Sequence, residues 1–283
     1  MTTTHQASAL APSAELQPST KPTGHLTFAK VVRSEWIKMV TLKTTWAMLA
    51  AIVVSIAGFA VLAAFAASGA TSTGPGRSGE DPVSTVMTGT ILGLLLVGTA
   101  GALLGSREYA SGLIRVTFTA VPSRVQVLAA KILVFTALTG VVVLVSTLVA
   151  FFAGMAVLSN GGAATLAWSD DGVARAVLGT VAYLTGLGVV GVALGVMLRN
   201  IGGSIAALIG GVIFLPTLAS ALLPQSWDGV FKYLPSNAAK SFTEVDPTAS
   251  GILLDTTTGA LVFATWVVIA VAGAVVLLRT RDA

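Results

Sequence analysis

The chain has 283 residues, of which 54% are hydrophobic and only 10% are charged. Soluble domains carry about 25% charged residues, so this composition, with a mean hydropathy of +0.88, excludes an ordinary soluble domain. The absence of cysteine excludes disulfide frameworks, Cys-ligated zinc and iron–sulfur clusters. The net charge of +4 is small, so the positions of the charges matter more than their sum.

The first 25 residues form a polar segment rich in Thr, Ser, Pro and Ala. Low hydrophobicity of this kind is typical of disorder. We therefore expect a disordered cytoplasmic tail over residues 1–25, followed by one membrane domain over residues 26–283. The tail does not have the pattern of a signal peptide, because the first apolar block starts only at Trp46 and is too long.

Residues Phe28 to Lys43 are predicted to form an amphipathic helix. Most apolar side chains, including Trp36, fall on one arc, and basic side chains such as Lys38 fall opposite. This pattern is typical of a helix that lies in the inner membrane interface. Glu35 departs from it, because it projects into the middle of the apolar arc. Either it pairs with Lys38 three residues on, or it contacts the cytoplasmic loop of the helical bundle.

Six windows without charged residues are long enough for membrane spans, which need about 20 residues each. The third window has 38 residues and could hold two short helices, or one long helix and a loop. A turn signal from Ser159 to Gly162 favours the second arrangement. Arg199, in a tight inner loop, also favours six spans with both termini inside over seven spans. The windows are Trp46–Ser68, Pro82–Ser106, Ile132–Ser169, Ala176–Leu198, Asn200–Trp227 and Thr256–Leu278.

The segment between the second and third spans mixes charged and apolar residues. Ser106 is expected to cap a short helix that Gly112 breaks, and Pro122 ends the segment. Ser123 and Gln126 then form a capping box at the start of the third span. A simple connector would not need this mixture, so a docking surface for a cytoplasmic partner is favoured over a membrane-surface helix. The side chains concerned are Arg107, Glu108, Tyr109, Leu113, Arg115, Phe118 and Arg124.

Small residues recur at four-residue spacing in several spans, which allows close helix contact. The fifth span has two such rows, and one of them consists of Gly203, Ala207 and Gly211. We predict a helix–helix contact on this face, within the subunit or between subunits. Shorter pairs with the same spacing are Gly89/Gly93, Gly101/Gly105 and Gly191/Gly195.

The outer segment from Leu223 to Thr257 is too long for a simple connector. Apolar residues from Trp227 to Leu234 follow helical spacing and predict a short helix on the outer interface. Pro235 is expected to stop this helix, and Ser236 to cap another helical turn. The segment is either a lid over a translocation path or an interfacial anchor.

The predicted spans lack the residue types that catalysis and ion coupling usually need. No Gly-x-x-x-x-Gly-Lys-Ser/Thr loop occurs, so the chain cannot bind and hydrolyse ATP by that route. The spans contain no His, Asp or Glu, which disfavours intramembrane proteolysis and ion-coupled carriers. Any transport must therefore draw its energy from another polypeptide. We expect no catalytic residue, no cofactor, no metal and no nucleic-acid partner.

Three stretches together resemble the membrane subunit of ABC-2 type ABC transporters. They are SEWIKMVTLKTTWAML at the first span, SREYASGLIRVTFTAVPSRVQVLAAKI after the second, and YLPSNAAKSF in the outer loop. The resemblance implies an all-α integral membrane fold with six transmembrane helices and an N-terminal amphipathic interfacial helix. It also implies that Arg107 to Arg124 is the coupling helix, which sits in a cleft of the ATPase subunit. Glu108 matches the family's acidic residue at the end of the second span.

The resulting hypothesis is a non-enzymatic permease subunit of an ATP-driven exporter in the plasma membrane. Its expected partners are a separate ABC ATPase, a second copy of the chain, membrane lipid and an unidentified exported substrate. One rival is a substrate-binding subunit like those of energy-coupling-factor importers, and another is a membrane anchor or sensor. For Glu108 we expect a basic partner on the ATPase, with Phe118 in an apolar pocket there. The alternative is that Glu108 only stabilises a helix N-terminus through its dipole.

Overall fold

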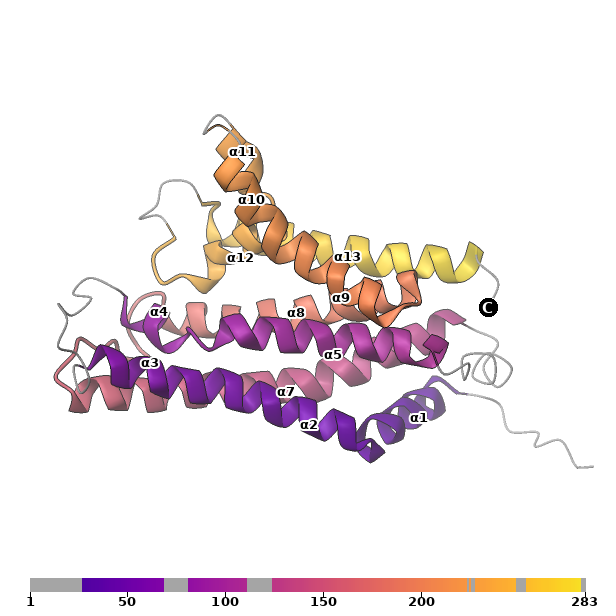
Figure 1. The fold of residues 1–283 in the computed structure, drawn as a ribbon, viewed down its shortest axis with the longest axis horizontal. Coiled ribbons are helices and arrows are strands. Elements are labelled where there is room, and N and C mark those ends of the chain that lie inside the picture. Colours follow the sequence, from indigo (N-terminus) through magenta and orange to yellow (C-terminus); the bar gives the residue numbers. More distant parts are fainter. Residues whose placement is uncertain are drawn as a thin grey trace, which may run out of the picture.

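The structure is a computed structural model that describes residues 27–68, 81–110, 124–222, 224, 227–247 and 253–280. Within these residues all regular structure is helical, and the long helices lie side by side along the longest axis (Figure 1). In chain order the elements are α1 (Phe28–Thr41), α2 (Lys43–Val53), the π turn η1 (Val54–Gly58), α3 (Phe59–Ala67), α4 (Pro82–Val86), α5 (Thr90–Ala110), α7 (Arg124–Asn160), α8 (Val173–Leu198), α9 (Ile201–Ile209), the π turn η2 (Gly210–Phe214), α10 (Leu215–Leu222), α11 (Asp228–Phe231), α12 (Pro235–Thr243) and α13 (Thr256–Thr280).

In the described part of the chain, five helical stretches are long and apolar enough to cross a membrane, which confirms the predicted all-α membrane fold. A shorter apolar stretch, Ile201–Val212, begins the fifth predicted window. There α9, η2 and α10 follow one another without a break, and the predicted sixth span corresponds to these three elements together. The five long stretches are Lys43–Ala67, Thr90–Tyr109, Arg124–Asn160, Val173–Leu198 and Thr256–Thr280.

One helix, α7, fills most of the long third window. It ends at Asn160, inside the predicted turn, and the backbone reverses at Gly162 with a φ of 72°. This is the left-handed conformation that glycine adopts without steric cost. Residues 163–172 then reach α8 without a helix. The seven-span alternative required two helices in this window, and the structure does not support it.

The predicted tight loop around Arg199 is also present. Arg199 ends α8 in a left-handed conformation with a φ of 52°. The next residue, Asn200, caps α9, because its Oδ1 accepts a hydrogen bond of 2.8 Å from the backbone N–H of Gly203. Two residues therefore suffice to reverse the chain between α8 and α9.

α5 and α8 approach each other so closely that glycine is required between them. A Cβ atom at Gly101 would overlap the carbonyl oxygen of Gly188, and one at Gly105 would overlap that of Val192. From the other side, a Cβ at Gly195 would press on the carbonyl oxygen of Ala102. Two of the predicted small-residue pairs therefore lie in one contact. We call it the glycine seam, made by Gly98, Gly101 and Gly105 of α5 with Gly188, Gly191 and Gly195 of α8.

A single π turn interrupts the helix in two of the predicted span windows. η1 lies in the first window, and η2 lies in the fifth, between α9 and α10. In a π turn the backbone N–H bonds to the carbonyl five residues back, and such turns often mark functional sites. The backbone carbonyls of Ser55 and Ile56 in η1 lie against Gly89, where any side chain would clash. The predicted pair Gly89/Gly93 thus accommodates η1.

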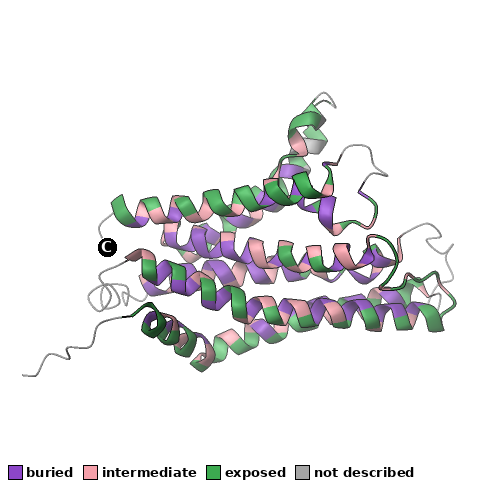
Figure 2. Ribbon diagram, turned by 180° about the vertical axis from the view of Figure 1, so that it is seen from behind, coloured by how far each residue is buried: buried purple, intermediate pink, exposed green. Residues whose placement is uncertain are grey.

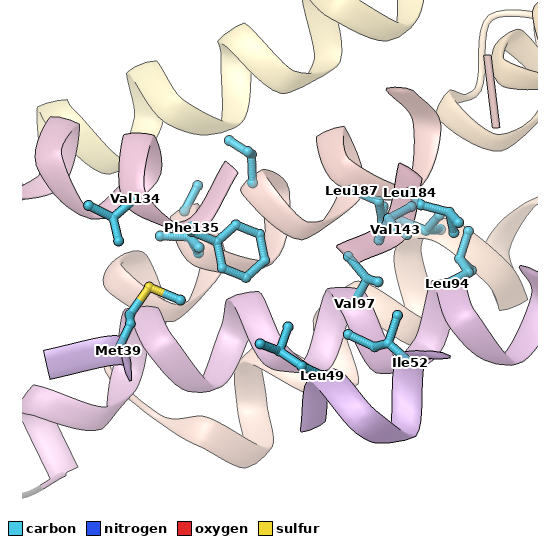
Figure 3. Packing of buried hydrophobic residues seen from close by; sticks show 14 of the residues in the cluster. Met39, Leu49, Ile52, Leu94, Val97, Val134, Phe135, Val143, Leu184 and Leu187 are labelled. Carbon is cyan, nitrogen blue, oxygen red and sulfur yellow. The ribbon is translucent and has the colours of Figure 1, made fainter. Parts of the chain in front are cut away.

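Buried side chains from α2, η1, α5, α7 and α8 form the main core. Figure 3 shows Ile52, Leu94 and Val97 facing Leu184 and Leu187 across the bundle. Figure 2 shows buried residues on the facing sides of these helices, while α11 and much of α13 are exposed. α13 adds Ala274 and Leu278 to this main cluster, and smaller separate clusters of buried residues lie beside it.

The outer segment differs from its prediction in the helix boundaries. Pro235 does not stop a helix but starts α12, where a missing N–H costs nothing. Leu234, and not Ser236, holds the position before it, and no side chain caps this helix. The expected short helix on the apolar residues is α11, and its Val230 is exposed.

α12 belongs to the bundle. Its Ala238, Ala239, Ser241 and Phe242 are buried between α8 and α13. Arg175, at the start of α8, donates hydrogen bonds to the carbonyl oxygens of Ser241 at 3.1 Å and Val245 at 2.7 Å. These contacts hold α12 against the two long helices.

Candidate functional site

α1 lies against α7 at the end of the bundle where α5 ends and α7 begins (Figure 1). We call this the α1 end. The predicted amphipathic helix is present and buries one edge, formed by Val31, Glu35 and Met39. Val31 packs on apolar residues of α7, whereas Trp36 is 43% exposed. The predicted apolar arc is therefore divided, with one edge against the bundle and the other on the surface.

Four charged side chains meet at the α1 end and join three helices. The two carboxylate oxygens of Glu35 lie 2.6 Å from Lys38 Nζ and 2.7 Å from Lys131 Nζ. Glu108 Oε1 of α5 lies 2.8 Å from the same Lys38 Nζ and 3.4 Å from Lys131 Nζ. We call Glu35, Lys38, Glu108 and Lys131 the ion cluster. The predicted pairing of Glu35 with Lys38 is confirmed, whereas its partner in the bundle is Lys131, a residue of the helix α7 and not of a loop.

Burial makes these pairs mutually dependent. Glu35 is 2% exposed and Lys131 5% exposed, and a buried charge is costly unless a partner compensates it. Two carboxylates and two ammonium groups make the ion cluster neutral as a whole. Although burial opposes its charge, hydrogen bonds to Glu108 and Glu35 raise the pKa of Lys38. Lys38 therefore stays charged at neutral pH and bridges the two carboxylates.

Glu108 lies in the last turn of α5, because this helix continues through Ser106 to Ala110. The expected cap at Ser106 is therefore wrong. Its hydroxyl donates to the carbonyl oxygen of Ala102 at 2.6 Å, a bond that serines make inside helices. The dipole alternative for Glu108 is wrong too, because a carboxylate at a helix C-terminus is unfavourable. Lys38 and Lys131 offset that unfavourable position.

Further contacts fix the two helix ends that flank the ion cluster. The guanidinium of Arg199 lies over the ring of Tyr109, 5.0 Å from its centroid. Arg124, the first residue of α7, donates a hydrogen bond of 3.2 Å to the carbonyl oxygen of Leu278 in α13. The end of α5 and the start of α7 are thereby tied to the α8–α9 turn and to α13.

The structure brings together four of the seven predicted coupling residues. Arg107, Glu108 and Tyr109 end α5, and Arg124 begins α7. Arg107 donates a hydrogen bond of 3.4 Å to Thr44 Oγ1 in α2. The other predicted residues of this segment lie outside the described residues: Gly112, Leu113, Arg115, Phe118, Pro122 and Ser123.

Sequence reasoning missed Lys131. Lys131 directly precedes the predicted third window, yet it is the eighth residue of α7 and is buried. It is also the only charged residue between Arg124 and Asp170. An isolated charge in an apolar helix usually has a buried partner and a function, and that signal could have found it.

The predicted packing row lies on the exposed side of α9 and η2. Gly203 and Ala207 are exposed, and a Cβ added at Gly211 would meet no atom within 4 Å. A Cβ added at Gly203 would approach only Asn200. Within the described residues the predicted helix contact is therefore not made on this face.

The ion cluster can transmit movement between helices, and its carboxylates are engaged by lysines. In the part of the chain that the structure describes, no group of three His, Cys, Asp or Glu residues could hold a metal ion. The fold and the site define a multi-pass membrane protein whose interfacial helix is joined by buried ion pairs to two of its spans.

The model of the ABC-2 family transporter proteins matches residues 31–213, from α1 into η2. The chain belongs to this family and is an ABC transporter permease, as the resemblance of its sequence indicated. No curated protein matches the chain. Family membership speaks against both rivals, the importer subunit and the membrane anchor.

Proposed function

We propose that the chain is the permease subunit of an ATP-driven exporter, works as a homodimer, and is driven by a separate ATPase subunit. The family supports an ABC ATPase as the general kind of partner. The chain has no phosphate-binding loop of its own, so hydrolysis belongs to that partner. The ion cluster carries the proposal, because it connects the helix ends that flank residues 111–123 to the interfacial helix.

The proposed orientation puts the α1 end in the cytoplasm and the chain in the plasma membrane. Cytoplasmic ends of spans carry an excess of Lys and Arg. Among the described residues, the opposite end carries only three such residues, Arg175, Lys232 and Lys240. The α1 end carries Lys30, Arg33, Lys38, Lys43, Arg107, Arg124, Lys131, Arg199 and Arg279.

In the proposed mechanism the ATPase acts on residues 107–124. The ends of this segment continue into α5 and α7, and the ion cluster joins both helices to α1. Moving one helix alone would break a buried ion pair, at a cost of about 3–5 kcal/mol. The three helices therefore move together. The ATPase can bias them only if it binds the segment differently in its two states.

This mechanism changes the role expected of Glu108. Its Oε1 is held by Lys38 and Lys131 of the same chain, so Glu108 acts as a positioning residue. Contact with the ATPase is then assigned to Leu113, Arg115 and Phe118, within residues 111–123. Phe118 keeps its proposed place in an apolar pocket of the partner.

The proposed homodimer forms through α9, η2 and α10. The row of Gly203, Ala207 and Gly211 is exposed, and its small residues allow two backbones to approach closely. Phe214, Leu215 and Leu218 extend the same stretch and are more than half exposed. A second copy of the chain would cover these side chains.

Photo-crosslinking tests the proposed coupling. Because the chain has no cysteine, Phe118→Cys can carry a benzophenone maleimide, with Lys232→Cys as the outer control. Each variant is co-expressed with a candidate stand-alone ABC ATPase subunit. We expect the label at 118 to capture the ATPase and the label at 232 not to. Capture from 232 alone, or no capture from 118 in a complex that co-purifies, would overturn the proposal.

A further inference from the structure

A cavity of about 540 Å³ lies beside the ion cluster, between α1, α2, α5 and α7. Pockets of about 300–1,000 Å³ hold small organic molecules. Figure 3 shows Met39, Leu49 and Phe135 directed inward from α1, α2 and α7, and all three line the cavity. Trp46 Nε1 donates to the carbonyl oxygen of Val40 at 2.8 Å across the α1–α2 bend. The cavity wall is therefore held in place.

The cavity has an apolar part and a polar rim. The apolar part includes Leu49, Leu103, Leu104 and Phe135. It follows α5 from Arg107 down to Ala100, a depth of about 10 Å at the helical rise of 1.5 Å per residue. A length of this order accommodates part of a hydrocarbon chain rather than a compact polar metabolite.

The rim is polar, and its ionisable side chains have a net positive charge. Threonine hydroxyls line it, and its five ionisable side chains are three cations and two carboxylates. The sum of these five charges is one positive charge, and Lys38 and Arg107 are two of the three cations. The side chain of Lys38 is 40% exposed and remains accessible from the rim.

We propose that this cavity binds one anionic phospholipid of the cytoplasmic leaflet. Its phosphate would bind beside Lys38 and Arg107, and an acyl chain would lie against Leu103, Leu104 and Phe135. Basic pockets between spans on the cytoplasmic side favour anionic head groups, and Arg–phosphate contacts are strong charge-assisted hydrogen bonds. The single excess charge matches the single negative charge of phosphatidylglycerol. The choice of leaflet rests on the orientation proposed above.

Native mass spectrometry of the purified full chain in detergent tests this site, with phosphatidylglycerol and phosphatidylcholine as probes. We expect phosphatidylglycerol to bind more tightly. Arg107→Gln should weaken that binding about five-fold, the effect of one basic group near a lipid head group. Ala100→Phe fills the cavity and should abolish it. Ala50→Phe, on the exposed side of α2 outside the cavity, is the matched control.

A diazirine-bearing phosphatidylglycerol locates the lipid on the unaltered chain, so the proposal can be tested even if Ala100→Phe does not fold. We expect crosslinks at Leu103 and Leu104. Equal binding of the two lipids, or crosslinks confined to the exposed side of α13, would overturn the proposal. The proposal would also be overturned if the chain bound dodecyl phosphate but not phosphatidylglycerol, because the ligand would then be a soluble amphiphile and not a membrane lipid. These measurements need no ATPase, so they stand apart from the coupling proposal, and labelling of a cysteine at position 199 reports the orientation separately.

Discussion

The glycine seam and the small-residue row on α9 and η2 have the same four-residue spacing, yet they differ in what they contact. In the seam, Gly101 and Gly105 face backbone carbonyls of α8. In the row, Gly211 faces no atom within 4 Å. The spacing permits close approach in both places. The position of the helix in the bundle decides whether the partner belongs to the same chain.

The seam is therefore part of the folded subunit, and the row is available to a second chain. The ion cluster resembles the seam in this respect, because its charges find their partners inside the subunit. Substitutions in the seam and in the ion cluster should change folding, whereas substitutions in the row should change only assembly. Four predictions test this difference.

The largest effect is expected for Gly101→Ala combined with Gly105→Ala. Each new Cβ would overlap a backbone carbonyl of α8, which cannot rotate away, so α5 and α8 must separate. The free energy of unfolding should fall by up to about 6 kcal/mol, twice the upper value for one overpacked site. Thermal melting of the purified chain in detergent measures this. A melting temperature equal to that of the unaltered chain would show that the seam is not closely packed.

Glu35→Ala should have the next largest effect. It leaves the buried Lys131 with Glu108 alone, at 3.4 Å, and an under-compensated buried charge costs about 3 kcal/mol or more. Arg33→Ala, on the exposed side of the same helix, is the control. Melting curves of both variants give the comparison. An equal fall in melting temperature for Glu35→Ala and Arg33→Ala would mean that the ion cluster adds nothing to stability.

Ala207→Leu combined with Gly211→Leu should leave the subunit folded and weaken its dimer. Nothing in the subunit is displaced at Gly211, whereas a closely approaching second copy would be pushed away. We expect about a ten-fold weaker dimer, equivalent to one overpacked contact. Crosslinking and light scattering in detergent report the dimer fraction. An unchanged dimer fraction would move the subunit interface to another face.

Gly210→Ala should have the smallest effect. A Cβ there meets no atom within 4 Å, and alanine favours a helix more than glycine does by about 1 kcal/mol. The melting temperature should therefore stay constant or rise slightly, in contrast to Gly101→Ala alone. If the two single variants were equally destabilised, the distinction between the seam and the α9–η2 stretch would be lost.

The sequence predicts the spans well because their signal is local. Long apolar windows and turn residues placed α7, the turn after Asn160 and the loop at Arg199 correctly. Boundaries that depend on tertiary contact were wrong. Ser106 has the chemistry of a cap, but the seam and the ion cluster hold α5 helical beyond it. Pro235 suits the end of a helix as well as its first turn.

The candidate site was predictable only in part. The misplaced carboxylate of Glu35 indicated a contact, because a charge on an apolar arc needs a partner. The identity of that partner depends on how α1 crosses α7, and nothing in the local pattern encodes it. Lys131 and Glu108 are 96 and 73 residues from Glu35 in the chain, and only the packed helices bring the three together.

The π turn η1 has a consequence for how the first span tolerates length changes. A turn whose hydrogen bond spans five residues contains one residue more than an α-helical turn. Val54–Gly58 therefore accommodates one extra residue inside the helix, and the span is lengthened by less than one helical step. Before this turn α2 packs against α5 and α7, and after it α3 packs against α4 and α7. The first span therefore consists of two helical parts, α2 and α3, whose side-chain registers differ by the extra residue of η1. Removing one residue inside η1 would turn α3 relative to α2. The side chains of α3 would then no longer face the residues that they contact now.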